Sequence, residues 1–499
     1  MKIKTFFFFI FIFLLLCFIS LTFANSAGSP RIVKADTQLI LPELPYWSYP
    51  NQEDFSLFQN GAELGHSVSA AGDLNNDGID DVIVGSLRFS DTVDKEGAIF
   101  LFLGSPQGLE NSPAWIMGGG QDSSQFGCAI DDVGDVNGDS ISDILVGSCN
   151  FNTEIKSSGK ISIYFGGTDI TSKNIEDWSV LGDQKESGFG SALSFAGDIN
   201  SDNYSDFVIG AKYYDTEGKT NNGKAFIFLG GENGEINLLS SWVPVGIDSY
   251  SMFGSSVAGA GDVDGNGYED IIVGAPGLSG NGFAYVFLNS EVGLESSPSW
   301  SLTNFQAGAK FGAVVASMGD VNKDGFDDLL VGSPSARNNN DEIVGCVYLF
   351  HGSSSGINLN SDWKHCGDQV GGQFGATLTF VDDMDNDPDH TSDFLVGMPN
   401  YSESSEQRGA IFLFFGSKSE ETGVSNYFEM AIGKQSESDF GSSLSSAGDV
   451  NYDRVIDVIV GSPLYKVSET SPIGRVVAYY TGVEGIPDSY QIFLPLVQR

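Results

Sequence analysis

Two landmarks recur together seven times along this chain: a dipeptide of an aromatic residue or leucine followed by glycine, and an acidic loop that begins nine residues after the dipeptide starts. The dipeptides are Leu64-Gly65, Phe126-Gly127, Phe189-Gly190, Phe253-Gly254, Phe311-Gly312, Phe374-Gly375 and Phe440-Gly441. Successive loops start 58 to 66 residues apart, so no copy leaves room for an inserted domain. Repeats at a regular period indicate one architecture of similar units instead of several unrelated domains.

Each copy carries segments typical of β-strands. A short apolar run ending in glycine follows every loop, as at residues 82–85, and a longer aromatic and β-branched stretch comes next, as at residues 98–104. A tryptophan then stands 11 residues before the next dipeptide in five copies, at Trp115, Trp178, Trp242, Trp300 and Trp363. No segment has a helical period. Four strands per unit predict an all-β fold, a seven-bladed β-propeller of four-stranded antiparallel blades around a central channel. The recurring tryptophans are interpreted as core residues between blades and not as a sugar-binding surface.

The ends of the array divide the chain into segments. We expect a signal peptide at 1–24, an N-terminal segment at 25–60, seven repeats at 61–482 and a C-terminal strand or tail at 483–499. Trp47 lies upstream of the first complete repeat, so residues near it are predicted to pair with repeat 7 and close the ring, which would cover an exposed sheet edge. A strand candidate at residues 491–497 competes for the same position. The sequence leaves both choices open.

The acidic loops place oxygen-bearing side chains at alternating positions. Position 1 is Asp73, Asp135, Asp198, Asp262, Asp320, Asp383 and Asp449. Position 3 is Asn75, Asn137, Asn200, Asp264, Asn322, Asp385 and Asn451, and position 5 is Asp77, Asp139, Asp202, Asn266, Asp324, Asp387 and Asp453. Main-chain carbonyls at position 7 belong to Ile79, Ile141, Tyr204, Tyr268, Phe326 and Val455. Position 9 is Asp81, Asp143, Asp206, Asp270, Asp328 and Asp457, while repeat 6 has its closing carboxylate two residues late, at Asp393.

This all-oxygen spacing predicts calcium sites, up to seven in number, because hard oxygen ligands suit Ca²⁺. The loops are not EF-hands, since position 12 is apolar, as at Val84 and Val331, where an EF-hand needs glutamate. One such loop alone could be an ordinary Asx-rich turn, but seven in register favour metal binding. Position 6 varies from Gly325 to Ser140 and Arg454, and repeat 6 contains Pro388, so the sites are expected to differ in quality, with repeat 6 the weakest.

The N-terminus and the cysteines indicate an exported protein. A basic start, an apolar run at residues 6–23 and a small-residue site at Ala24 form a secretory signal pattern, with cleavage expected after Ala24 and an uncleaved membrane anchor as the alternative. Outside this segment the four cysteines pair most simply within single repeats, as Cys128 with Cys149 and Cys346 with Cys366. These two local disulfides are preferred among three pairings.

Charge and histidine content limit the function classes. The formal net charge is −42, so the protein repels phosphate backbones and nucleic acid is excluded as a partner. The four histidines, His66, His351, His365 and His390, suggest no His-based metal centre, and residues 352–356, which match a nucleophile-elbow pattern, align with a connecting turn in repeat 1. A binding protein is therefore favoured over an enzyme. The alternatives are a calcium-dependent enzyme acting on polysaccharide and a structural cell-surface component.

The three spaced elements together resemble the FG-GAP repeats of the integrin alpha-chain N-terminal propeller. They are the Phe-Gly dipeptide, the acidic loop and the tripeptides Gly274-Ala275-Pro276, Gly332-Ser333-Pro334 and Gly461-Ser462-Pro463, and the match covers roughly residues 40 to 482. The resemblance implies structural calcium on one propeller face and recognition of an extracellular protein or glycan in cell adhesion on the other. Nothing after Gly482 resembles a membrane span, so a secreted or cell-surface, free-standing relative is expected.

Overall fold

The computed structural model describes residues 46–50, 57–277, 280–304, 306–384, 390–418, 422–468 and 471–481. The chain separates into Met1–Glu43 and Leu44–Arg499, and all described residues belong to the second part. The expected signal peptide at 1–24 and the C-terminal strand candidate at 491–497 lie outside the described residues.

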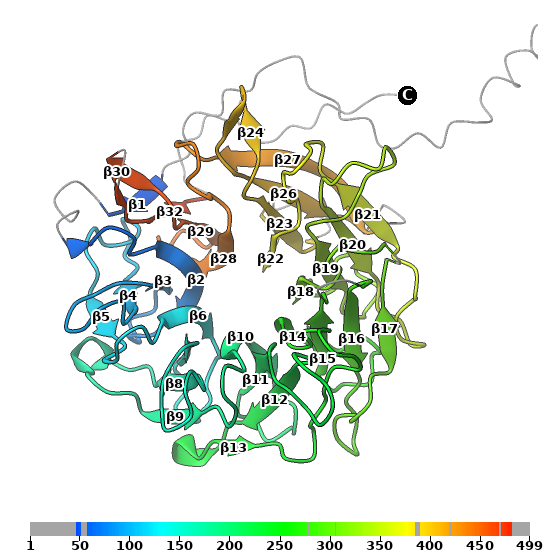
Figure 1. Ribbon diagram of the computed structural model, residues 1–499, viewed down its shortest axis with the longest axis horizontal. Helices are drawn as coiled ribbons and strands as arrows, with labels where there is room; N and C mark the ends of the chain where they lie inside the picture. The colour runs from blue at the N-terminus through cyan, green and yellow to red at the C-terminus, as the bar shows by residue number, and fades with distance from the viewer. Residues whose placement is uncertain are drawn as a thin grey trace, which may run out of the picture. The chain divides into compact units, whose positions relative to one another are not determined.

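The described residues form seven four-stranded antiparallel sheets, as expected for a seven-bladed propeller. Figure 1 shows the sheets arranged around a central channel, with one strand of each sheet innermost. The first four blades are β2 (Leu64–Gly72), β3 (Asp81–Ser86), β4 (Ala98–Phe102) and β5 (Trp115–Gly118); β6 (Phe126–Asp132), β7 (Ile144–Ser148), β8 (Lys160–Tyr164) and β9 (Trp178–Leu181); β10 (Phe189–Gly197), β11 (Asp206–Ala211), β12 (Lys224–Leu229) and β13 (Asn237–Leu238); and β14 (Ser256–Gly261), β15 (Asp270–Ala275), β16 (Phe283–Phe287) and β17 (Trp300–Leu302).

The remaining three blades follow the same order. They are β18 (Val314–Ser317), β19 (Leu329–Ser333), β20 (Cys346–Phe350) and β21 (Trp363–Cys366); β22 (Thr377–Val381), β23 (Asp393–Met398), β26 (Ala410–Gly416) and β27 (Val424–Ile432); and β28 (Ser443–Gly448), β29 (Asp457–Ser462), β32 (Arg475–Tyr479) and β1 (Tyr46–Tyr49). Two small hairpins, β24 (Ser402–Glu403) with β25 (Glu406–Gln407) and β30 (Lys466–Ser468) with β31 (Ser471–Pro472), extend from loops of blades 6 and 7.

The second strand of each blade is buried along its whole length. This explains its uninterrupted apolar sequence, because both faces of the strand pack against neighbouring blades. The glycine near the end of this second strand allows the next blade to approach closely. A Cβ atom on Gly274 would collide with the carbonyl oxygen of Gly312, the dipeptide glycine of the next blade, which itself has φ of 78°. The two recurring glycines of each repeat therefore form the contact between successive blades.

The ring is closed by the N-terminal strand. β1 pairs antiparallel with β32, with Trp47 opposite Ala478, so blade 7 contains strands from both ends of the described chain. Trp47 also donates its indole N–H to the carbonyl oxygen of Glu110 in blade 1, at 3.0 Å. The outer edge of β32 is therefore covered by β1, and blade 7 is joined to blade 1.

The tryptophans pack within the protein core. Trp242, Trp115 and Trp47 are almost fully buried, and Trp115 lies edge-on to Tyr164 of the next blade, with ring centroids 5.2 Å apart. Its indole N–H reaches the carbonyl oxygen of Lys173 at 2.8 Å. Trp178, Trp300 and Trp363 are half-buried and also pack against hydrophobic core clusters. The recurring tryptophans therefore contribute to the core, as the sequence predicts.

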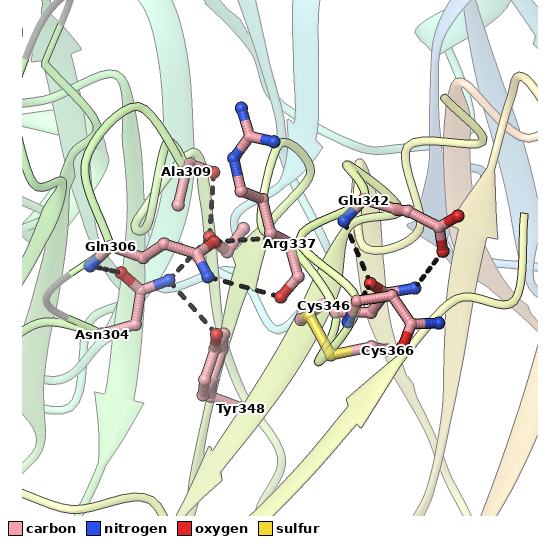
Figure 2. Close-up of a disulfide and its surroundings, with 11 residues drawn as sticks. Asn304, Gln306, Ala309, Arg337, Glu342, Cys346, Tyr348 and Cys366 are labelled. Atoms are coloured by element: carbon pink, nitrogen blue, oxygen red, sulfur yellow. Dashed lines mark hydrogen bonds between the residues drawn. A yellow bond between two sulfur atoms is a disulfide. The ribbon is translucent and has the colours of Figure 1, made fainter. Parts of the chain in front are cut away.

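The two local disulfides are confirmed. Cys128–Cys149 joins β6 to the residue after β7, and Cys346–Cys366 joins directly paired residues of β20 and β21. Figure 2 shows the second bridge on the strand pair next to the loops at residues 304–309 and 337–342. Each disulfide therefore ties neighbouring strands of one blade.

Candidate metal loops

Every acidic loop connects the innermost strand of a blade to its second strand. Because the seven blades repeat the same strand order around one axis, the loops gather at one end of the channel. Six loops lie within the described residues; in the loop between β22 and β23, residues 385–389, which include Asp385 and Asp387, lie outside them.

Loop 5 illustrates how the backbone wraps around its own carboxylates. Asp320 accepts the backbone N–H of Asp324 on Oδ1, at 3.0 Å, and that of Gly325 on Oδ2, at 2.8 Å. Asp324 in turn accepts the N–H of Phe326 at 3.1 Å. The same pattern recurs in loops 1, 2, 3, 4 and 7. These turns bring positions 1, 3 and 5 to one side of the loop.

Position 6 is left-handed in all six described loops. Its φ is 91° at Gly78, 96° at Gly325, 69° at Ser140 and Asn203, and 71° at Arg454. Glycine adopts this conformation without strain and asparagine tolerates it, whereas serine and arginine do so at a cost. The loops therefore share one backbone shape, and repeats 2 and 7 carry residues less suited to it.

The carboxylates at position 9 are buried and are held by backbone N–H groups. Asp328 is 0% exposed and accepts the N–H of Val321 at 3.1 Å and of Gly352 at 2.9 Å. The pKa of Asp328 is raised to about 8, mainly by burial and in smaller part by the carboxylates of Asp324 and Asp320, while the two N–H donors lower it. Asp81, Asp143, Asp270 and Asp457 show the same shift to about 8, and Asp206 shows one to about 7. Each of these six loops thus concentrates negative charge next to a buried position-9 carboxylate that has no ion pair with a basic side chain among the described residues.

The structure brings candidate ligands together most closely in repeat 4. Ligand oxygens of Asp262, Asp264 and Asp270 all lie within 4.8 Å of one another, the one such group among the described residues. Loops 1 and 7 have a different signature, since each leaves two buried oxygens without a hydrogen-bond partner: Oδ1 of Asn75 with Oδ2 of Asp81, and Oδ2 of Asp453 with Oδ2 of Asp457. Unpartnered acceptor oxygens in an all-oxygen set fit a hard cation such as Ca²⁺.

Repeat 6 departs from the other loops. Asp393 occupies the position-9 role despite its late place in the sequence, because it accepts the N–H of Met384 at 2.8 Å and of Gly416 at 3.0 Å. Asp383, at position 1, contacts Nδ1 of His390 at 2.6 Å. A histidine beside the first ligand competes with a cation for the same carboxylate, which agrees with the low rank that the sequence gives this loop.

The structure also shows contacts between neighbouring loops that the sequence did not predict. Asp80 accepts the N–H of Asp449, the first residue of loop 7, at 2.8 Å, and Asp327 accepts the N–H of Asp262, the first residue of loop 4, at 2.8 Å. Both carboxylates come from position 8 of the adjacent blade. Their sequence signal is only an acidic residue before position 9, which does not reveal a partner 369 residues away.

A second missed feature is a glutamine five residues before the dipeptide. Figure 2 shows Gln306 bound to the main chain of Arg337: Oε1 accepts the N–H at 2.5 Å, and Nε2 donates to the carbonyl oxygen at 3.3 Å. Equivalent side-chain bonds to the main chain of the corresponding loop come from Gln121, Gln184, Gln369 and Gln435, and Gln59 donates to the carbonyl oxygen of Arg88. The recurrence of glutamine at one repeat position was the available signal. These contacts position the loops at the end of the blades opposite the acidic loops.

The histidines do not form a common site. Burial lowers the pKa of His365 to about 4, where it packs among Phe374, Phe414 and Tyr427. The pKa of His66 is likewise lowered to about 4, mainly by burial and in smaller part by the charges of Arg88 and Lys212. Both side chains are neutral at physiological pH, as expected for structural histidines.

Comparison with known proteins agrees with the repeat and the fold. The FG-GAP repeat family matches residues 64–102, 189–228, 253–287 and 311–345. The chain is 30% identical over 202 residues to integrin alpha-PS3 of Drosophila melanogaster, which is 39% of this chain and 17% of that protein. It is 32% identical over 222 residues to integrin alpha-5 of Xenopus laevis, or 42% and 20% of the two chains. It is 35% identical over 164 residues to human integrin alpha-IIb, or 31% and 16% of the two chains.

The matched region is therefore a fifth or less of the length of these relatives. Among the described residues no helix has the length and apolar character needed to cross a membrane. The relatives are integrin alpha chains, which agrees with the expectation of a binding protein and not an enzyme. Four segments of the chain therefore match the FG-GAP repeat family, the chain is similar in sequence to integrin alpha chains, and its described residues form a seven-bladed propeller.

Proposed function

We propose that this protein is an extracellular calcium-binding propeller that acts as a binding or cell-adhesion-like module. The observation that carries the proposal is the repetition of one loop geometry around the ring, in which a buried position-9 carboxylate accompanies the candidate ligands at positions 1, 3 and 5. Loops 1 and 7 add unpartnered oxygens, and loop 4 brings three carboxylates close together. Self-repelling carboxylates in one loop need a cation to stabilise the folded form.

The role proposed for the metal is structural. Calcium supplies positive charge that offsets the carboxylates of each loop. The protein supplies Asp320, Asn322, Asp324 and Asp328 in loop 5 and their equivalents elsewhere, already oriented by backbone N–H groups. Because each loop links the two inner strands of a blade, metal binding would stiffen the part of the blade next to the channel.

Location and partner follow from separate observations. The secretory pattern at residues 1–24 and the two disulfides support export to an oxidising compartment, either secreted or at the cell surface. Similarity to integrin alpha chains supports an extracellular protein or glycan as the partner. The partner is expected on the face opposite the acidic loops, where the connections between second and third strands lie.

The test is a calcium titration of chelator-treated protein, with bound metal measured by calorimetry and the melting temperature measured on the same samples. Several ions per chain and a rise in melting temperature are expected, since a ligand at 100 times its Kd stabilises by about 2.7 kcal/mol per site. Asp320→Asn should lose one ion per chain. Asp341→Asn, at an exposed position in another loop of blade 5, is the matched control and should bind as wild type does. If chelation changes neither quantity, the acidic loops are ordinary turns.

A further inference from the structure

The innermost strands of the seven blades enclose a cavity of about 490 Å³ along the channel. Each of these strands contributes one aliphatic residue to the wall, for example Val68, Ile130 and Leu193. The next residue along the strand is the fifth after the start of the dipeptide. Six blades have alanine, serine or threonine there, and blade 2 has Asp131. At this level the channel wall thus carries small side chains, several with hydroxyl groups, and one carboxylate, next to a ring of aliphatic residues.

Asp131 is held in place by both neighbouring blades. Its Oδ2 accepts the backbone N–H of Phe195 in blade 3 at 3.0 Å, and its Oδ1 accepts the hydroxyl of Ser69 in blade 1 at 3.3 Å. In the described part of the chain Asp131 has no ion pair with a basic side chain. Burial raises its pKa to about 7, and the neighbouring Asp132 contributes to that rise. The structure therefore orients a carboxylate on the cavity wall without a positive charge beside it.

Two aromatic rings are also exceptions to the repeat. Phe195 and Phe380 line the cavity one residue after this level, where the other blades have smaller side chains such as Gly259 and Ser317. They are 42% and 39% exposed, which is high for phenylalanines inside a channel. The face of an aromatic ring attracts a cation, and its edge and face also pack against methylene groups.

The cavity is unsuited to the other common ligand classes. Calcium takes six to eight oxygen ligands, which one carboxylate and a few hydroxyls among aliphatic residues do not supply. An anion would meet the carboxylates of Asp131 and Glu269, both in the lining, in a protein of net charge −42. A neutral apolar molecule would leave the carboxylate of Asp131 buried and unpaired, which is costly.

We propose that the channel binds a small organic cation, a primary ammonium group on a short apolar stem. The ammonium group pairs with Asp131, and the stem packs against the aliphatic ring and Phe195. This site is separate from the acidic loops and goes beyond the proposed function.

The experiment titrates n-pentylammonium into the calcium-saturated protein by calorimetry, with 1-pentanol as the uncharged probe of similar size. Wild type is expected to bind the ammonium and to bind 1-pentanol far more weakly. Asp131→Asn keeps an oxygen that can accept the N–H of Phe195 but removes the charge, and should weaken ammonium binding about 10- to 100-fold, the range for bonds to charged groups. Phe195→Leu should weaken it several-fold by removing the ring face.

Asp132→Asn is the matched control. It removes the same charge one residue away, but Asp132 is not in the cavity lining and its Oδ1 accepts the N–H of Gly134 at 2.9 Å. It should bind n-pentylammonium at least as well as wild type does, because Asp131 keeps its charge and loses a carboxylate that raises its pKa. Ser445→Leu, which fills the cavity from blade 7, should abolish binding whether or not Asp131 is changed.

Two results would overturn the proposal: no binding of n-pentylammonium by wild type, or equal binding by wild type and Asp131→Asn. Calcium stoichiometry and melting temperature, recorded for every variant, separate this outcome from misfolding. A protein that takes up calcium but not the amine rejects the channel site alone. A protein that binds the amine but not calcium rejects the proposed role of the loops.

Discussion

At the residue scale, two glycines per repeat set how closely the blades pack. Gly274 and Gly312 face each other across the junction of blades 4 and 5, and a side chain on Gly274 has no room. Close packing makes such a junction sensitive to a single added methyl group. Glycine is favoured at position 6 of the loops for its backbone conformation and not for close packing, since Gly267 and Gly325 have positive φ but open space around them.

Gly274→Ala should therefore destabilise the protein more than Gly267→Ala. The first substitution forces two blades apart, at a cost of about 2 to 3 kcal/mol. The second strains only one left-handed residue, at about 1 kcal/mol. Melting temperatures in saturating calcium give the comparison. Equal decreases in melting temperature for the two variants would mean that the blades move apart at the junction at little energetic cost.

His365 should make the protein sensitive to acid. Its pKa falls from 6.5 to about 4 on folding because the ring is buried among aromatic side chains. The unfolded chain therefore takes up a proton at a higher pH than the folded one, and stability that is present above pH 6.5 is lost as the pH falls toward 4. The difference corresponds to on the order of 3 kcal/mol.

The measurement is chemical denaturation in saturating calcium between pH 4 and pH 7. His365→Leu should remove this part of the pH dependence, while Lys364→Leu, on the exposed side of the same strand, should keep it. If the stability of wild type and of His365→Leu depended on pH in the same way, the pKa of His365 would be the same in the folded and unfolded chain.

At the element scale, the strands of one blade differ in how extensively they pack against neighbouring blades. The inner three strands of a blade are packed on neighbours, while the outermost strand is short in most blades, as β13 and β17 show; β27 of blade 6 is longer. In blade 5 the outermost strand β21 is also fixed by Cys346–Cys366, and Gln306 ties the nearby loop to the connector that precedes the blade. A covalent link at an outer strand opposes fraying where packing is weakest.

Replacing both Cys346 and Cys366 by alanine should lower the free energy of unfolding by about 3 kcal/mol, the expected effect of opening a loop of this size. Hydrogen exchange should rise first in β21 and much less in β19. Treating both proteins with the same reductant provides the control: Cys128–Cys149 opens in both, but exchange in β21 should rise only in wild type. Unchanged exchange in β21 would mean that Trp363 packing alone holds the strand.

At the scale of the whole molecule, stability depends on closing the ring. β1 covers the edge of β32, and Arg475 donates to the hydroxyl of Ser48 at 2.7 Å. Leu109 of blade 1 also donates its N–H to the hydroxyl of Tyr480, at 2.8 Å. The first and last blades are therefore joined by strand pairing and by side-chain contacts, so removing one strand affects both.

A chain that begins at Leu57 and so lacks β1 should melt at a lower temperature and associate through the uncovered edge of β32. A chain that begins at Leu44 keeps β1 and should behave as the full chain does. Light scattering and thermal melting make the comparison. Identical behaviour of both shortened chains would show that β1 contributes little to closure.

The sequence alone determined what is local or repeated: seven units, four strands in each, one acidic loop per unit, and two cysteine pairs within single repeats. Hydrophobic periodicity and turn chemistry act over a few residues, so a sequence displays them directly. The tertiary structure alone decided which segment pairs with β32, that Asp80 contacts loop 7, and that Asp131 and Phe195 share one cavity. Those contacts join residues tens to hundreds of positions apart, and they exist only because seven twisted sheets close around one axis.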